Sequence, residues 1–424
     1  SEELASYCLS CHRCDEICST RIPIADLVRK LREKIVREKG GKAWKKAAFG
    51  VVLGRPQVER RIFALGRAAR PLISKEGRVK WPLAVGVMKR LEKFPAPAEK
   101  SFTALVAEEK GKDRERENDI ARKMEKEGDS EGEKERVTEN KNENKGINES
   151  TSHKKYTSEK DKKEKLPGAG KKVAIFPGCL IENFFPEAGL AAYRLLRRHG
   201  YEVEVPFDGC CGFPAANSGY AEEARKEFGR VAEKLLAGDH YRVVTLCPTC
   251  TAMLKELGPE LTADIMLDEK KAAVFRERVK TFVSFVAEEG LRITAAEEQE
   301  LGPGTAKKIE GAEGGKREIK ITYHDSCHHK FVLKEAELSR RLLREAGYEL
   351  VEMEQADVCC GFAGVFSVEH AEVSEELLRQ KLEAIEQAGA EMVVMDCPGC
   401  ILQIKGGLLA GKKPVKARHS AELL

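Results

Sequence analysis

Two long stretches of the chain alternate short apolar runs with amphipathic helical patterns. In the first stretch, apolar runs at 173–176, 201–205 and 242–246 are separated by helical periodicity over 187–199 and 220–237. Short apolar or alternating runs indicate strands, and apolar residues spaced three or four apart indicate helices. Strands that alternate with helices in this way predict a parallel α/β unit.

The second stretch repeats the same order of elements. Strands are predicted at 319–323, 348–353 and 392–395, and helices at 334–346 and 369–388. The sequence therefore predicts an α/β protein with two tandem units of this kind. Because parallel sheets carry their sites at the carboxyl ends of the strands, we expect the functional groups of each unit at that rim.

Ten of the fourteen cysteines follow these predicted strands in two matching sets. The first set is Cys179, Cys210, Cys211, Cys247 and Cys250, and the second set is Cys327, Cys359, Cys360, Cys397 and Cys400. The single cysteine precedes the pair by 31 and 32 residues, and the pair precedes the closing Cys-Pro-x-Cys by 36 and 37 residues. Two five-thiol sets at matched spacing indicate metal or redox chemistry rather than core packing.

The adjacent cysteines favour an iron–sulfur cluster, because two neighbouring thiolates reach separate irons more easily than one tetrahedral ion. Gly212 and Gly361 follow the pairs and permit a close backbone approach. Pro248 and Pro398 fix the backbone of the closing loops. Zinc remains an alternative, although five thiols exceed its four ligands, and so does thiol–disulfide exchange. Structural disulfides are disfavoured in a long chain with this clustering.

The four remaining cysteines stand near the start of the chain in Cys-x2-Cys-x2-Cys-x3-Cys spacing. They are Cys8, Cys11, Cys14 and Cys18. This is the bacterial ferredoxin run, which predicts a cubane [4Fe–4S] cluster, with a zinc site as the alternative. The fourth cysteine of such a run can serve a second cluster, so Cys18 either closes its own cluster or belongs to another. His12 lies inside this loop and is expected to face solvent.

Residues 21–100 read as a helical and strongly basic segment. They contain 22 basic and 7 acidic side chains, an excess of +15. Apolar residues fall on one helical face and aromatic residues interrupt the charge: Ile24, Leu27, Val28, Leu31 and Ile35, then Trp44, Phe49, Trp81 and Phe94. The pattern fits either a solvated face or a surface that docks on an acidic partner or an anionic membrane. No nucleic-acid reading motif accompanies the charge, so no nucleic-acid partner is predicted.

The remaining segments read as linkers. Mixed charge and few apolar residues predict a disordered segment, with a transient helix near 113–127. The expected domains are a helical ferredoxin-like and basic docking region at 1–100, a disordered charged linker at 101–170, α/β units at 171–300 and 319–424, and a linker at 301–318. No apolar run approaches the length of a membrane span and no signal peptide is visible, so we expect a cytoplasmic protein.

Three histidines flank Cys327, and two of them are candidates for a catalytic role. His324 and His328 could lower the pKa of the thiol, donate a hydrogen bond to a cluster or deliver protons, as could His329. The alternative is that these side chains only orient the loop.

Three motifs resemble a known family. Tyr323-His-Asp-Ser-Cys-His328, Cys359-Cys-Gly-Phe-Ala-Gly364 and Cys397-Pro-Gly-Cys-Ile-Leu-Gln-Ile404 are similar to the cysteine-rich CCG domains of several iron–sulfur oxidoreductases. These are heterodisulfide reductase catalytic subunits and the iron–sulfur subunits of glycolate oxidase, of lactate-utilisation enzymes and of anaerobic glycerol-3-phosphate dehydrogenase. The resemblance covers 171–424 and, more loosely, 1–70. Ser326 replaces the proline usual in the family, and one ferredoxin run stands where the family usually has two.

The resemblance implies two CCG domains behind a small helical ferredoxin-like domain, with one CCG-type [4Fe–4S] cluster on each five-cysteine set. It also implies an electron-transfer subunit of a flavin-dependent complex that oxidises glycolate, lactate or glycerol-3-phosphate. The flavin is expected on a flavoprotein dehydrogenase subunit, because this chain has no dinucleotide fingerprint. A membrane or quinone-linked subunit is a further expected partner, with peripheral contact at the inner membrane face. The alternatives are a disulfide reductase that acts at a noncubane cluster and an interaction protein with structural zinc.

Overall fold

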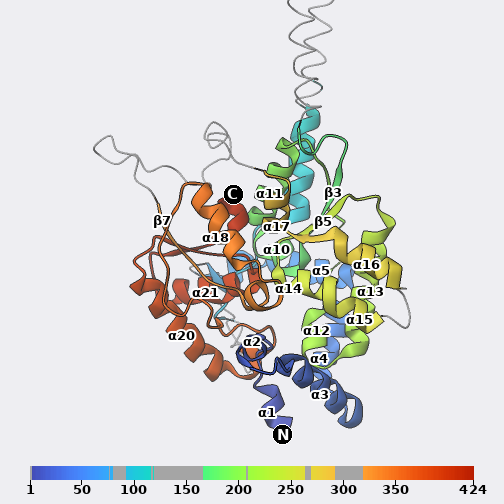
Figure 1. Ribbon diagram of the computed structural model, residues 1–424, viewed down its shortest axis with the longest axis vertical. Helices are drawn as coiled ribbons and strands as arrows, with labels where there is room; N and C mark the ends of the chain where they lie inside the picture. The colour runs from blue at the N-terminus through green and yellow to red at the C-terminus, as the bar shows by residue number, and fades with distance from the viewer. Residues whose placement is uncertain are drawn as a thin grey trace, which may run out of the picture.

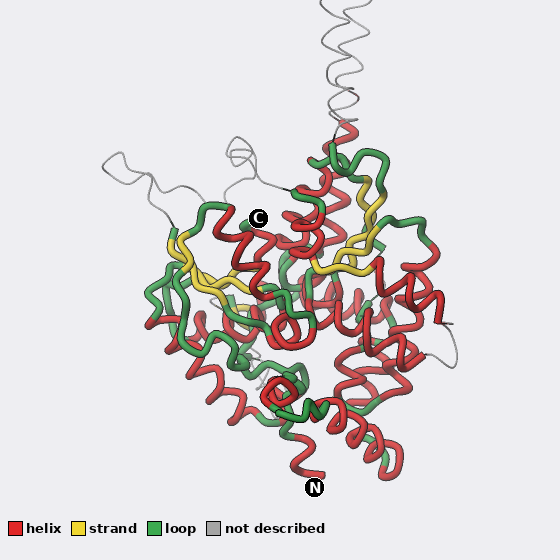
Figure 2. Tube along the Cα trace, in the orientation of Figure 1, coloured by secondary structure: helices red, strands yellow, loops and turns green. Residues whose placement is uncertain are grey.

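The computed structural model describes residues 2–75, 77–79, 92–115, 118, 166–206, 209–262, 269–291 and 319–424. Two parallel sheets with flanking helices lie beside each other, and the N-terminal helices α1 to α4 lie at one end of the molecule (Figure 1). Helices and strands alternate through both α/β units (Figure 2). The predicted α/β class with a helical N-terminal region is confirmed. We refer to the described residues of 166–291 and to 319–424 as the first and second repeats.

The first repeat holds four strands in the order β4-β3-β5-β6, and all neighbours are parallel. The strands are β3 (Lys172–Phe176), β4 (Glu202–Glu204), β5 (Arg242–Thr245) and β6 (Val279–Thr281). The helices α11 (Pro186–Arg198) and α13 (Ala221–Ala237) form the connections, as predicted. Strand β6 and the helices α16 (Glu269–Arg278) and α17 (Phe282–Glu288), which were not predicted, complete the unit.

The second repeat has the equivalent strand order, β8-β7-β9-β10, again with all neighbours parallel. Its strands are β7 (Lys320–Tyr323), β8 (Glu349–Leu350), β9 (Met392–Met395) and β10 (Lys416–His419), and its helices include α18 (Ala336–Glu345), α20 (Ala371–Gln387) and α21 (Pro398–Ala410). Strand β8 is shorter than the predicted 348–353, since only two of its residues pair with β7. The shared order shows that the repeats are two copies of one unit.

The central strands are buried on both faces because helices cover both sides of each sheet. Val173, Ile175, Val243 and Val393 are all inaccessible to solvent. Continuous apolar runs of this kind are typical of parallel sheets. One apolar core runs through both repeats, so the two units are packed against each other.

The helix α3 (Ile24–Lys39) presents its apolar stripe to solvent, not to the core. Leu27 is 54% exposed, whereas Ala25 and Arg29 are buried. Arg32 orients the helix by donating hydrogen bonds to the carbonyl oxygens of Ala5 at 2.9 Å and Asn217 at 2.8 Å. The helix thus clamps the N-terminal loop onto the first repeat, and its apolar stripe remains available for contacts.

The aromatic residues of the basic segment differ from the expectation of a row of surface anchors. Phe49 and Phe94 are buried and contact Tyr220 and Phe362 in edge-on geometry. Trp44 is exposed, and Trp81 lies outside the described residues. Phe49 and Phe94 therefore attach the basic segment to the two repeats.

The predicted linker at 101–170 begins later than expected, because residues 102–115 form a helix. Phe102 is buried against Gly189 of α11, and Glu109 accepts two hydrogen bonds of 2.9 Å from Arg194. Two apolar residues four apart, Phe102 and Val106, suffice to anchor this otherwise charged helix. Residues 119–165 and the predicted linker at 301–318 lie outside the described residues.

Gly361, directly after the second cysteine pair, has φ of +84°, and an added Cβ would lie 2.6 Å from the backbone oxygen of Ser374. We predict that Gly361→Ala lowers the free energy of unfolding by about 2–4 kcal/mol, because left-handed backbone costs an alanine roughly 1–2 kcal/mol and the clash adds to it. Urea denaturation under anaerobic conditions measures the change.

Gly389→Ala is the matched control, since Gly389 has φ of +65° but no atom within 4 Å of an added Cβ. It should lower the free energy of unfolding by about 1 kcal/mol, because only the left-handed backbone disfavours alanine there. Equal losses in the two variants would show that the close approach to Ser374 does not constrain the turn.

Candidate functional site

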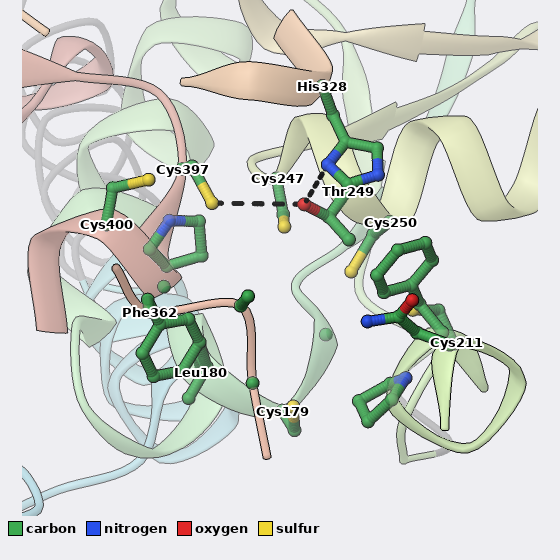
Figure 3. A pocket seen from close by; sticks show the side chains of 18 of the residues that line it. Cys179, Leu180, Cys211, Cys247, Thr249, Cys250, His328, Phe362, Cys397 and Cys400 are labelled. Atoms are coloured by element: carbon green, nitrogen blue, oxygen red, sulfur yellow. Dashed lines mark hydrogen bonds between the residues drawn. The ribbon is translucent and has the colours of Figure 1, made fainter. Parts of the chain in front are cut away.

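All ten cysteines of the two sets line one cavity between the repeats, which encloses about 120 Å³. Figure 3 shows Cys247, Cys250 and Cys179 on one side of this cavity and Cys397 and Cys400 on the other. Each set converges at the carboxyl ends of its strands, where the sequence placed it. The structure adds that the two sets face each other across a single space.

The local structure explains why each closing Cys-Pro-x-Cys points at the cavity. Cys247 immediately precedes α14 (Pro248–Ala252), and Cys397 immediately precedes α21. Proline at the first helical position is favoured because no N–H partner is needed there. The helix N-terminus carries a partial positive charge, which stabilises thiolates at this position.

Neighbouring thiols shift one another's pKa in one continuous series. In the first set it runs from Cys179 through Cys210, Cys211 and Cys250 to Cys247, and in the second set from Cys327 through Cys359, Cys360 and Cys400 to Cys397. Cys247 and Cys397 join the two sets. Hydrogen bonds from Cys179 and Cys211, together with burial, hold the pKa of Cys210 well above its ordinary value.

These thiols fit an iron–sulfur group. All fourteen cysteines are free, so the close contacts are not disulfides. Ten thiolates cannot ionise together in a buried cavity unless positive charge is supplied, because burial disfavours each charged form. A set of sulfur ligands selects zinc, copper(I) or iron–sulfur clusters, and five thiols exceed the four that zinc takes. The adjacent pair in each set would bind separate irons of such a cluster more easily than one tetrahedral ion.

His324 stands at the second set. One of its ring nitrogens and the sulfurs of Cys360 and Cys400 all lie within 4.8 Å of one another. Its Nδ1 lies 3.1 Å from the carbonyl oxygen of Ala356, whereas Nε2 has no hydrogen-bond partner among the residues that the structure describes. Burial and, next, the charge of Lys381 lower its pKa to about 3. A neutral His324 therefore directs one ring nitrogen toward the thiols.

His328 bridges the two repeats. Its Nδ1 lies 3.4 Å from the hydroxyl of Thr249 in the first repeat and 3.6 Å from the sulfur of Cys327, and Figure 3 shows Thr249 between His328 and Cys397. Burial lowers the pKa of His328 to about 4. His329 points elsewhere and lies 3.1 Å from the hydroxyl of Tyr323. The structure thus places His324 and His328, but not His329, at the thiols.

His419 also helps to form the site, although the sequence did not predict it. Its Nε2 lies 2.9 Å from the carbonyl oxygens of both Leu246 and Asp396, the residues just before Cys247 and Cys397. One ring at the end of β10 therefore holds the two closing loops side by side. No motif marks His419 in the sequence, because its role depends on the packing of the two repeats.

Three of the four N-terminal cysteines lie close together, beside the second repeat. Burial, and then the charges of Cys359 and Cys8, raise the pKa of Cys11. Cys11 and Cys8 also act on Cys14, whose pKa is raised to about 11 mainly by burial and by Asp15. Cys18 instead hydrogen-bonds the hydroxyl of Thr20 at 3.2 Å. The run thus adjoins the second set, with Cys18 turned toward its own loop.

His12 is only partly exposed, with 20% of its side chain accessible, although it was expected to face solvent. Its Nδ1 lies 2.8 Å from Asp15, and its ring centroid lies 5.7 Å from that of His328. The two imidazoles connect the N-terminal loop to the rim of the thiol cavity. Only the fold brings these distant residues together.

Comparison with known proteins agrees with this geometry. The cysteine-rich domain named CCG matches the chain twice, at residues 173–255 and 321–405. Lactate utilization protein A of Geobacillus sp. strain WCH70 is 35% identical over 256 residues, which are 60% of this chain and 98% of the relative. Lactate utilization protein A of Bacillus subtilis strain 168 is 33% identical over 257 residues, again 60% and 98%. The chain belongs to the family of CCG cysteine-rich proteins that includes these lactate utilization proteins.

Proposed function

We propose that this chain is the iron–sulfur electron-transfer subunit of a flavin-dependent complex that oxidises a 2-hydroxy acid, namely lactate or glycolate, or glycerol-3-phosphate. The observation that carries the proposal is the convergence of ten free thiols, five from each repeat, on one buried cavity. We choose this class of substrate because the chain is similar to lactate utilization proteins.

Each five-thiol set would hold one CCG-type [4Fe–4S] cluster, and Cys8, Cys11 and Cys14 with Cys18 would hold a cubane. When bound, such clusters accept and release single electrons. The side chains of Leu180, Phe213 and Phe362 line the same cavity and limit the access of water. Limited access favours relay of electrons over reaction with a bound substrate.

The contacts between sets support a relay with three stations. Thr249 of the first repeat lies 3.9 Å from the sulfur of Cys397 in the second, and the charges of Cys11 and Cys359 act on each other. In such a relay the second set would be the middle station. This arrangement would keep each electron step short.

The flavin would belong to a flavoprotein dehydrogenase subunit, since hydride or two-electron chemistry on a hydroxy acid needs a cofactor that thiol-bound clusters do not supply. This chain would then accept single electrons from the flavin. The competing function is reduction of a disulfide at the cavity, with His324 and His328 as the nearest proton carriers.

The direct test is to purify the tagged chain anaerobically from its own cells together with the proteins that bind it. We expect lactate, glycolate or glycerol-3-phosphate to bleach the visible iron–sulfur absorbance of the complex. The separated chain should be bleached by dithionite but by none of these substrates. Disulfide reduction by the separated, dithionite-reduced chain would contradict the relay and support the competing function.

The basic segment would dock the chain on its partner subunits or, peripherally, on a membrane. In α5 (Pro56–Ala68) and α6 (Arg70–Ile73), Leu65 is 70% and Leu72 84% exposed. Arg61, which is also exposed, stands one helical turn before Leu65 on α5. Among the described residues, no helix is long and apolar enough to span a bilayer. A membrane-linked or quinone-linked subunit would be a further partner.

We predict that combining Lys46→Glu, Arg55→Glu and Arg61→Glu weakens complex formation at least about tenfold at low salt, because like charges then face an acidic partner. The loss should shrink as salt screens the surface. Binding is measured by interferometry on the purified complex components.

The control carries the same charge change on the repeats, as Lys270→Glu, Arg341→Glu and Lys412→Glu, all at exposed positions. It should bind as the parent does. Equal weakening in both triple variants would assign the effect to net charge and remove the docking role of the basic segment.

A further inference from the structure

The two repeats differ in the helix that packs behind the cysteine pair. Helices α13 and α20 both have 17 residues and share one register, because Gly212 packs on the fourth residue of α13 and Gly361 on the fourth residue of α20. The eleventh position of these helices is Val231 in the first repeat and Lys381 in the second. Both side chains are buried, with exposures of 1% and 2%. The first repeat thus has an apolar side chain at the position where the second repeat has a buried amine.

Lys381 is aimed at the loop that carries the second cysteine pair. Its Nζ donates hydrogen bonds to the carbonyl oxygens of Gln355 at 2.6 Å and Ala356 at 3.3 Å. Its charge acts on the thiols of Cys360 and Cys359 and, more weakly, on Cys400. In the described part of the chain, no carboxylate oxygen lies within 4.0 Å of this Nζ to neutralise it.

The other charges near the second set are already paired. Asp325 is buried but receives hydrogen bonds from Arg340 at 2.5 Å and Lys330 at 2.8 Å. Asp357 acts on Lys381 only weakly, as the last of the groups that do so. Burial lowers the pKa of Lys381, and the charges of Cys360 and Cys359 are the first groups that oppose this shift.

The first set has different surroundings. Glu227 is 1% exposed and stands on α13 where α20 has Leu377. Burial and, next, the charge of Cys211 raise the pKa of Glu227 to about 8. Arg230 and Glu59 are the next charged groups around it. The helix behind the first pair thus supplies both Glu227 and Arg230, whereas the helix behind the second pair supplies Lys381.

We propose that Lys381 is a positioning residue that gives the second thiol-bound centre a higher reduction potential than the first. The proposal rests on the proposed function, since it assumes a redox centre on each set. An ammonium ion in a low-dielectric interior stabilises the added negative charge of the reduced state. In the exchange, one electron leaves the first centre, which is oxidised, and enters the second, which is reduced, and no bond is made or broken. Lys381 thereby holds the electron beside the N-terminal run.

The test is a redox titration of the anaerobically purified protein, followed by EPR. Lys381→Gln keeps an N–H donor for Gln355 and Ala356 but removes the charge. At a fixed potential we expect it to lower the ratio of reduced to oxidised second centre at least about tenfold, which is ~59 mV for a one-electron couple. Lys381→Arg, which keeps the charge, should restore most of the ratio. The second-centre signal is identified as the one lost in Cys360→Ser.

Val231→Met in α13 is the matched control and should leave the second-centre ratio unchanged. An unchanged ratio in Lys381→Gln at full iron content would overturn the proposal while leaving the proposed function intact. A parent protein without iron would overturn both. Should Lys381→Gln lose iron, Lys381→Met and Lys381→Arg are titrated instead, and a parental ratio in Lys381→Met would equally overturn the role of the charge.

Discussion

Ten thiols in one buried cavity impose the constraint on which the rest of this structure depends. Thiolates repel one another strongly when water is excluded, so the sulfurs can be held together only as partly protonated groups or as ligands of positive ions. The two parallel sheets end at this cavity, the glycine turns bring the cysteine pairs to it, and His419 ties the loops before Cys247 and Cys397 together. These elements of the fold together bring the ten cysteine side chains to one cavity.

Two copies of one unit surround the cavity, but they are not chemically equivalent. The second copy contributes His324, His328 and Lys381, whereas the first contributes Thr249 and Glu227. Different buried charges beside two equivalent thiol sets would make two centres of the same type differ in potential. The N-terminal run adjoins the copy that contains Lys381. The centre with the higher proposed potential would therefore be the one beside the N-terminal cysteines.

Most strands, the main helices and both cysteine sets could be predicted from the sequence, because each depends on a local pattern of residues. Apolar runs and helical periodicity identified three strands and the main helices of each repeat, and cysteine spacing identified both thiol sets. The strands β6 and β10 were missed, since Val279–Thr281 and Lys416–His419 are short and carry polar residues. The contacts of His419 and the outward apolar stripe of α3 depend on packing between distant segments, which no local pattern records.

The most direct test of the central claim is the content of iron and acid-labile sulfide per chain in anaerobically purified protein, with EPR of the oxidised and reduced forms. The account predicts about twelve irons with matching sulfide, and signals of two kinds, one from a cubane and the other from the CCG-type sites. Zinc in place of iron, or thiols without metal, would contradict it.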